Sequence, residues 1–106
     1  MRYQFTRRHE AGQKLRVSFE FFPPNNDGMA ERLSHTIARL APLNPSFASV
    51  TYGAGGSTRE RTATTLRQIM RETAMAPAAH LTCVDADRET VDGVVEEFAA
   101  MGIRRF

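Results

Sequence analysis

Apolar and polar residues alternate from Leu15 to Phe22. Successive side chains of a strand point to opposite faces, so this alternation predicts a half-buried β-strand over residues 15–22. Pro23 and Pro24 end the run, because proline cannot donate to a strand ladder and restricts the residue before it. The two predicted faces are Leu15, Val17, Phe19 and Phe21 on one side and Arg16, Ser18, Glu20 and Phe22 on the other.

Three later segments repeat their apolar residues at helical spacing. The first spans residues 29–40, the second begins near Ser57 and ends before Pro77, and the third follows Asp87. Asp87 is placed to cap its helix, and Gly102 stands where a C-terminal cap favours positive φ. The predicted buried faces are Met29, Leu33, Ile37 and Leu40, then Ala63, Leu66, Met70 and Ala74, then Val91, Val94, Val95, Phe98 and Met101.

Strand-like segments separate these helices at residues 47–52 and 78–84, and residues 103–106 resemble the start of a fourth strand. Such β-α alternation predicts a parallel sheet, either open and doubly wound or part of a (β/α)₈ barrel. Polar residues two apart on each strand favour the barrel, because doubly wound sheets bury both faces under helices. These polar pairs are Ser18 and Glu20, Ser49 and Thr51, and His80 and Thr82.

A chain of 106 residues can form one small domain, whereas a complete (β/α)₈ barrel needs about 250 residues. We therefore expect residues 1–14 to form an N-terminal arm. Residues 15–106 are expected to form the first three to four β/α units of an incomplete barrel, cut at the start of strand 4.

Composition narrows the class of protein further. The apolar fraction of 42%, the charged fraction of 25% and the net charge of +2 are ordinary for a globular protein, and no dense basic stripe indicates nucleic-acid binding. Cys83 is the single cysteine, which excludes an internal disulfide and suits a reducing compartment. No signal peptide or membrane span is apparent, so we expect a soluble, cytoplasmic protein without membrane association.

Glu20 is the first candidate for chemistry. It stands among three phenylalanines at the end of a predicted strand, where desolvation would raise its pKa and suit it to donate a proton. The alternative is an ion pair with Arg16 or another cation on the same face.

The glycine-rich turn after Thr51 and the strand residue His80 are further candidates. The turn could bring backbone N–H groups to an anion, or it could simply be a tight connection with a good helix cap. It matches neither the dinucleotide fingerprint nor the P-loop. His80 either contacts a ligand or is a satisfied core histidine. It lies on the opposite strand face from Cys83, expected to be a small core residue, so no metal site is predicted.

Three segments in order resemble the signatures of the methylenetetrahydrofolate reductase family: VSFEFFPP at 17–24, PSFASVTYGAGGSTRERT at 45–62 and HLTCVD at 80–85. The resemblance covers nearly the whole chain after residue 14. It implies a (β/α)₈ barrel that holds FAD and uses NADH or NADPH to reduce 5,10-methylenetetrahydrofolate to 5-methyltetrahydrofolate. It also implies a homo-oligomer for the intact enzyme, and a further Arg-Gly-Asp motif that this sequence does not contain.

The same resemblance assigns roles to single residues. Glu20 matches the family's catalytic glutamate, which donates a proton as the five-membered ring of the folate opens. Thr51 matches a threonine near the flavin ring and the nicotinamide. Tyr52, Ala54 and Gly55 match the turn along the flavin, and His80 matches a histidine that contacts it.

Alternatives to an active enzyme stay open on the sequence. The chain could be inactive alone and persist only as a non-catalytic subunit or interaction module. A different barrel enzyme or an open-sheet nucleotide binder would require the motif match to be accidental. We expect the isolated 106-residue chain not to hold FAD.

Overall fold

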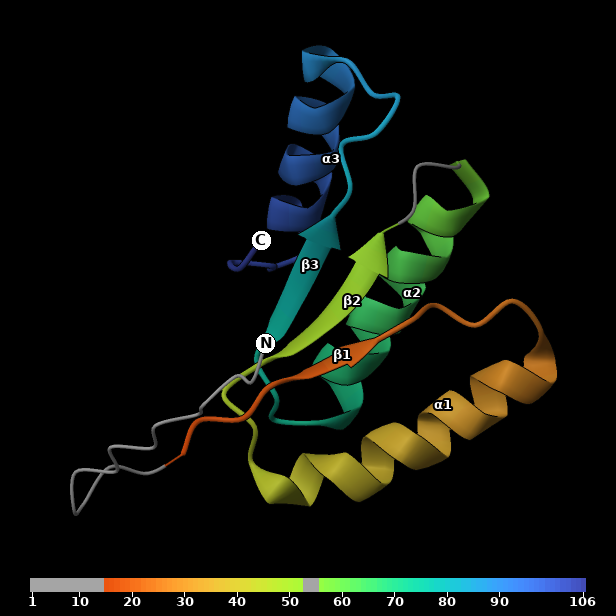
Figure 1. Ribbon diagram of the computed structural model, residues 1–106, viewed down its shortest axis with the longest axis vertical. Coiled ribbons are helices and arrows are strands. Elements are labelled where there is room, and N and C mark those ends of the chain that lie inside the picture. Colours follow the sequence, from red (N-terminus) through yellow and green to blue (C-terminus); the bar gives the residue numbers. More distant parts are fainter. Residues whose placement is uncertain (1–14, 53–55) are drawn as a thin grey trace, which may run out of the picture.

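The computed structural model describes residues 15–52 and 56–106, so the predicted arm at 1–14 lies outside the described residues. Strands and helices alternate along the chain, as the sequence predicts (Figure 1). The elements are β1 (Phe19–Phe21), α1 (Asp27–Leu40), the 3₁₀ helix η1 (Ala41–Leu43), β2 (Ala48–Tyr52), α2 (Gly56–Glu72), β3 (Pro77–Leu81) and α3 (Arg88–Ala100).

The strands form one parallel sheet in the order β1-β2-β3. Glu20 is opposite Ser49 in the register, and Thr51 is opposite His80. Arg105 makes a parallel bridge to Ala78, so the chain after α3 returns to the free edge of β3. The parallel α/β class predicted from the sequence is therefore confirmed.

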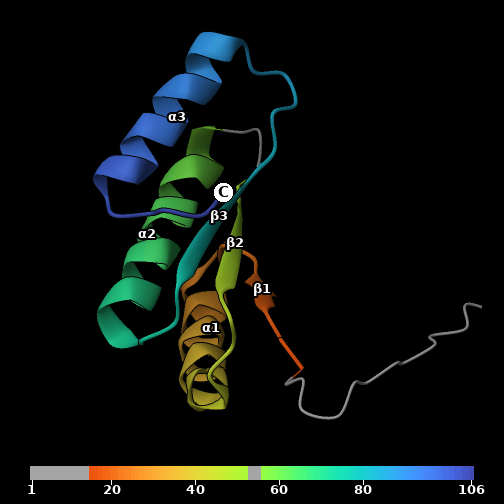
Figure 2. The ribbon, with the colours of Figure 1, turned by 90° about the vertical axis from the view of Figure 1, so that its left-hand side faces the viewer.

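Helices α1, α2 and α3 lie on the same side of the sheet (Figure 2). A doubly wound sheet would carry helices on both faces, whereas a (β/α)₈ barrel places every helix outside its strands. Sequential strand order with one covered face is consistent with part of a barrel. In the part of the chain that the structure describes, no helix covers the other face of β1, β2 and β3, which we call the open face.

The core lies between the sheet and the helices, and it corrects part of the predicted strand face. Phe21 is buried as expected, but Leu15 and Val17 are 76% and 43% exposed. The strand starts only at Phe19, whose register partner Ala48 is the first residue of β2. Leu15 and Val17 precede this paired region, so the alternating pattern extends further than the strand does.

The helix faces also differ from the prediction in places. Met29 and Met70 are exposed, and Ala74 lies on the surface just after α2. The buried stripe of α2 instead runs from Leu66 to Ile69, a step of three residues where the prediction took a step of four. In α3 the prediction holds, since Val94 and Phe98 are buried.

Both predicted features at the ends of α3 are confirmed. The side chain of Asp87 accepts a hydrogen bond of 2.8 Å from the backbone N–H of Thr90. Gly102 has φ of 103°, a region that L-residues rarely adopt. At the start of α1, the Asn26 side chain caps the helix by accepting a hydrogen bond of 2.8 Å from Met29 N–H.

Gly102→Ala should lower the free energy of unfolding by roughly 1–3 kcal/mol, because a side chain there is strained. Its Cβ would also lie 3.1 Å from Met70 Cε. Gly93→Ala is the matched control. Gly93 is inside α3, and a Cβ added there would have nothing within 4 Å. Because alanine favours a helix more than glycine does, this variant should raise the free energy of unfolding by about 0.5–1 kcal/mol. Urea denaturation of both variants measures these opposite changes in the free energy of unfolding. A higher free energy of unfolding for Gly102→Ala would contradict the account.

Candidate functional site

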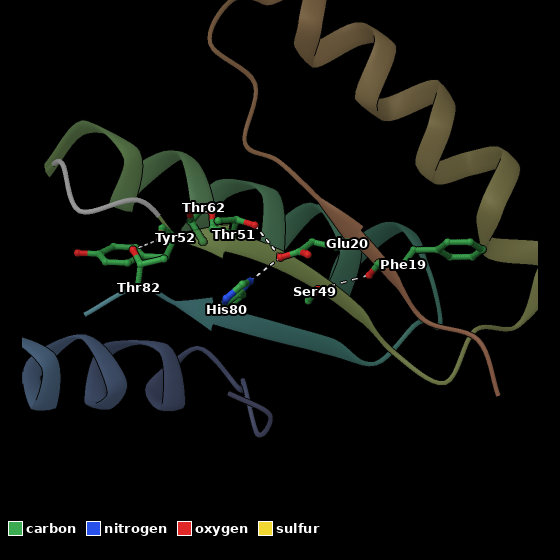
Figure 3. Close-up of polar contacts among 8 residues, drawn as sticks. All are labelled: Phe19, Glu20, Ser49, Thr51, Tyr52, Thr62, His80 and Thr82. Atoms are coloured by element: carbon green, nitrogen blue, oxygen red, sulfur yellow. Dashed lines mark hydrogen bonds and ion pairs between the residues drawn. The ribbon is translucent and has the colours of Figure 1, made fainter. Parts of the chain in front are cut away.

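The face of the sheet without helices carries polar side chains at neighbouring register positions. Glu20 comes from β1, Ser49 and Thr51 from β2, and His80 from β3 (Figure 3). Side chains in register on adjacent parallel strands share a face, so the polar pairs noted in the sequence come together here. Ser49 donates a hydrogen bond of 3.5 Å to the carbonyl of Phe19, which ties β2 to β1 at this point.

Glu20 is at the centre of this polar group. The Thr51 hydroxyl donates to Glu20 Oε1 at 2.7 Å, and His80 Nδ1 lies 2.5 Å from the same oxygen. The side chains of Glu20 and His80 are each about half exposed, at 42% and 54%. Thus two residues far apart in the sequence, Thr51 and His80, converge on one carboxylate oxygen of Glu20 at the surface of the sheet.

These contacts lower the pKa of Glu20 from its ordinary value. The hydrogen bond from His80 contributes most and the one from Thr51 contributes next, since both stabilise the charged form. The predicted rise in pKa is therefore wrong for this open face. Phe19 and Phe21 belong to the other side of the strand and Phe22 is 69% exposed, so burial raises the pKa of the carboxyl group less than the two hydrogen bonds lower it.

The alternative predicted from the sequence, an ion pair with Arg16 or another cation on the same face, is wrong for Arg16 among the described residues but is met by His80 when its imidazole is protonated. The charge partner there is His80, which the register places two strands away. Sequence alternation could place Glu20 and His80 on one face, but it could not show that their side chains touch.

Two threonines outside the predicted site residues, Thr62 and Thr82, hold the end of β2. Thr62, fully buried in α2, donates to the carbonyl of Thr51 at 2.9 Å. Thr82 was predicted to share the polar strand face with His80, but it follows the end of β3 and donates to the carbonyl of Tyr52 at 2.5 Å. The sequence signal that could have identified Thr62 is its position beside the apolar stripe of the helix that became α2. These bonds fix the backbone that positions Thr51.

The remaining predicted site residues are placed differently. Tyr52 is only 9% exposed, and its ring meets Phe98 edge-on at a centroid distance of 6.3 Å. Its side chain therefore packs into the core, on the opposite face from Thr51. Ala54 and Gly55 lie outside the described residues. Cys83 is exposed, so the expectation of a buried core cysteine is wrong, because β3 ends at Leu81 before reaching it.

A groove of about 550 Å³ lies along the polar face, and Glu20, Ser49 and His80 are among its lining residues. Within residues 15–52 and 56–106, no group of three or more His, Cys, Asp or Glu side chains is arranged to hold a metal ion. In the same ranges no helix combines the length and apolarity needed to cross a membrane.

Comparison with known proteins gives consistent matches. The model of the family described as methylenetetrahydrofolate reductase matches residues 4–106. A 5,10-methylenetetrahydrofolate reductase of Pectobacterium carotovorum is 44% identical over 91 residues, or 86% of this chain and 30% of the relative. The protein of that name from Escherichia coli K12 is 40% identical over 95 residues, or 90% of this chain and 32% of the relative.

A plant protein, methylenetetrahydrofolate reductase (NADH) 1 of Arabidopsis thaliana, is 35% identical over 95 residues. That match covers 90% of this chain and 16% of the plant protein. The chain thus spans about a third of the length of the bacterial relatives it matches.

Proposed function

The chain belongs to the methylenetetrahydrofolate reductase family, and we propose that it serves the reduction of 5,10-methylenetetrahydrofolate to 5-methyltetrahydrofolate. The electron donor is NADH or NADPH and the cofactor is FAD. The observation that carries the proposal is the convergence of Thr51 and His80 on Glu20, in a groove on the open face of the sheet.

The described residues fit part of a flavin site. The Thr51 hydroxyl and the His80 imidazole lie on the open face, and His80 lines the groove of about 550 Å³. Helix α2 begins at Gly56, just beyond the carboxyl end of β2, and a helix N-terminus favours an anion such as a diphosphate. Thr51, His80 and the turn containing Ala54 and Gly55 are the proposed flavin contacts. Tyr52 would contribute through its backbone, since its ring is in the core. When bound, FAD supplies the hydride transfer between nicotinamide and folate.

Glu20 is the proposed proton donor to the folate. Opening the five-membered ring leaves an amine nitrogen that must receive a proton, and Glu20 is the carboxyl group on the open face. The acid must be neutral to donate, yet its pKa is lowered while the face is open to water. Covering the groove with cofactor and substrate removes water from the carboxyl, which raises its pKa toward the value this role needs.

Three further properties belong to the same proposal. The open face of the sheet becomes the lumen of a closed (β/α)₈ barrel, to which residues 15–106 contribute three to four β/α units and so only part of the flavin site. The intact enzyme is a homo-oligomer. It works in the cytoplasm, a proposal supported by a single cysteine, which suits a reducing compartment.

The test uses the full-length enzyme, by which we mean the complete gene product containing this segment at the length of its bacterial relatives. Purified with FAD and supplied with NADH or NADPH, it should convert 5,10-methylenetetrahydrofolate to 5-methyltetrahydrofolate, detected by chromatography. A protein that holds flavin and passes electrons to menadione but leaves the folate unchanged would overturn the proposal.

A further inference from the structure

The two contacts of Glu20 meet the same oxygen atom. Thr51 Oγ1 and His80 Nδ1 both lie within hydrogen-bond distance of Oε1, at 2.7 and 2.5 Å. Among the described residues, no hydrogen bond reaches Oε2. Both hydrogen bonds therefore hold one oxygen of a side chain that lines the groove, and the second oxygen has no hydrogen bond among these residues.

The geometry also fixes where His80 carries its proton. A carboxylate oxygen has no hydrogen to donate, so the imidazole must donate from Nδ1 when Glu20 is charged. The Thr51 hydroxyl turns its hydrogen to the same atom. When Glu20 is neutral, Thr51 and His80 can both still donate to Oε1 only if Oε1 carries no hydrogen. The acid proton must then be on Oε2.

We infer that His80, with Thr51, is a positioning residue for Glu20: the two side chains hold Oε1 as an acceptor, so that Oε2 delivers the proton. This inference rests on the proposed function, and it gives His80 a role beyond contact with the flavin. In the step, the O–H bond at Oε2 breaks and an N–H bond forms on the departing amine of the folate. Glu20 becomes a carboxylate stabilised by the two donors, and solvent returns the proton.

His80 is the titratable group that touches Glu20 on this face. Arg104 and Arg105 line the same groove, coming from the segment after α3. The guanidinium group of Arg104 donates to the carbonyls of Ala99 and Ile103. In the part of the chain that the structure describes, neither arginine forms an ion pair with Glu20, whose ion pair is with His80. Coupling between Glu20 and His80 should therefore dominate the titration of the carboxyl group.

The first test is a ¹³C NMR titration of the Glu20 carboxyl in the 106-residue chain, which needs neither flavin nor activity. The wild-type pKa should lie below the ordinary value, and His80→Ala should raise it, because the larger of the two stabilising bonds is lost. His80→Asn keeps an N–H near the Nδ1 position and should leave the pKa closer to wild type. Thr51→Val, which keeps the shape but not the hydroxyl, should raise the pKa less. An unchanged Glu20 titration in His80→Ala would overturn the inference.

The second test is the pH profile of folate reduction in the full-length enzyme. Activity should fall with rising pH as Glu20 loses its proton. Because His80→Ala raises the pKa of Glu20, the alkaline limb of its pH profile should move to higher pH. On the acidic plateau, where Glu20 is protonated in every variant, the rate should drop by up to about tenfold through loss of one charge-assisted hydrogen bond. His80→Asn should restore both features. If His80→Ala lowered the rate but left the alkaline limb of the pH profile at the same pH, His80 would be a merely structural residue and the inference would be refuted.

The two tests separate this inference from the proposed function. If the wild-type enzyme reduces no folate, the proposed function fails, and the NMR titration still decides whether His80 controls Glu20. If the enzyme reduces folate but the pKa of Glu20 is the same in His80→Ala as in wild type, the proposed function holds and the positioning role of His80 is wrong.

Discussion

Glu20→Gln should reduce the rate of folate reduction by about 10²–10⁴-fold, the usual contribution of a general acid. Glutamine is nearly the same size, and its Oε1 can still accept from Thr51 and His80. The variant therefore keeps the geometry and loses only the acid proton. Electron transfer from NADH through the flavin to menadione needs no proton from Glu20, so it should fall far less. Steady-state rates with the two acceptors, measured on the full-length enzyme, check this.

Glu31→Gln is the matched control for this prediction. It removes the same charge from α1, where the Glu31 side chain is 79% exposed and lies on a helix away from the open face. Both rates should stay near wild type. If Glu20→Gln lowered the folate and menadione rates by the same factor, Glu20 would be a structural residue instead of the acid.

Phe98→Ala should remove about 3–5 kcal/mol from the free energy of unfolding, as expected for a large core aromatic. Phe98 is fully buried in α3, and its ring packs edge-on against Tyr52 at the carboxyl end of β2. A domain of this size has only about 5–15 kcal/mol of stability in total. The loss is a large part of this total, so the urea concentration at the midpoint of unfolding should fall markedly when denaturation is followed by circular dichroism.

Phe22→Ala provides the comparison, since Phe22 is 69% exposed beside the polar face of β1. It removes the same side chain from a place where little is buried, so the loss should be within about 0.5 kcal/mol. Equal losses for the two variants would mean that Phe98 is not part of the core described above.

The alternation of strands and helices, and hence the parallel α/β class, could be predicted because each pattern is local. A period of two marks a strand and a period of 3.6 marks a helix, whatever the rest of the chain does. The cap at Asp87 and the positive φ at Gly102 are equally local. These features depend on residues within one turn of each other, so the sequence contains all that is needed.

Features that depend on neighbouring elements could not be predicted as well. Whether Ile69 or Met70 faces the core depends on how α2 rotates against the sheet, which both helical spacings allow. Leu15 is exposed because the pairing of β1 with β2 begins only at Phe19 and Ala48, and this pairing depends on a segment far away in the sequence. Glu20 shows the largest consequence. Its lowered pKa depends on hydrogen bonds from Thr51 and His80, which lie on the two other strands and which no local pattern could bring into contact with it.

The most direct test of Glu20 as proton donor isolates the folate half-reaction. Full-length enzyme with pre-reduced flavin is mixed rapidly and without oxygen with 5,10-methylenetetrahydrofolate, and the return of the oxidised flavin absorbance is followed. Wild-type flavin should reoxidise, whereas the flavin of Glu20→Gln should stay reduced about 10²–10⁴ times longer. Reoxidation of the Glu20→Gln enzyme at the wild-type rate would contradict the account.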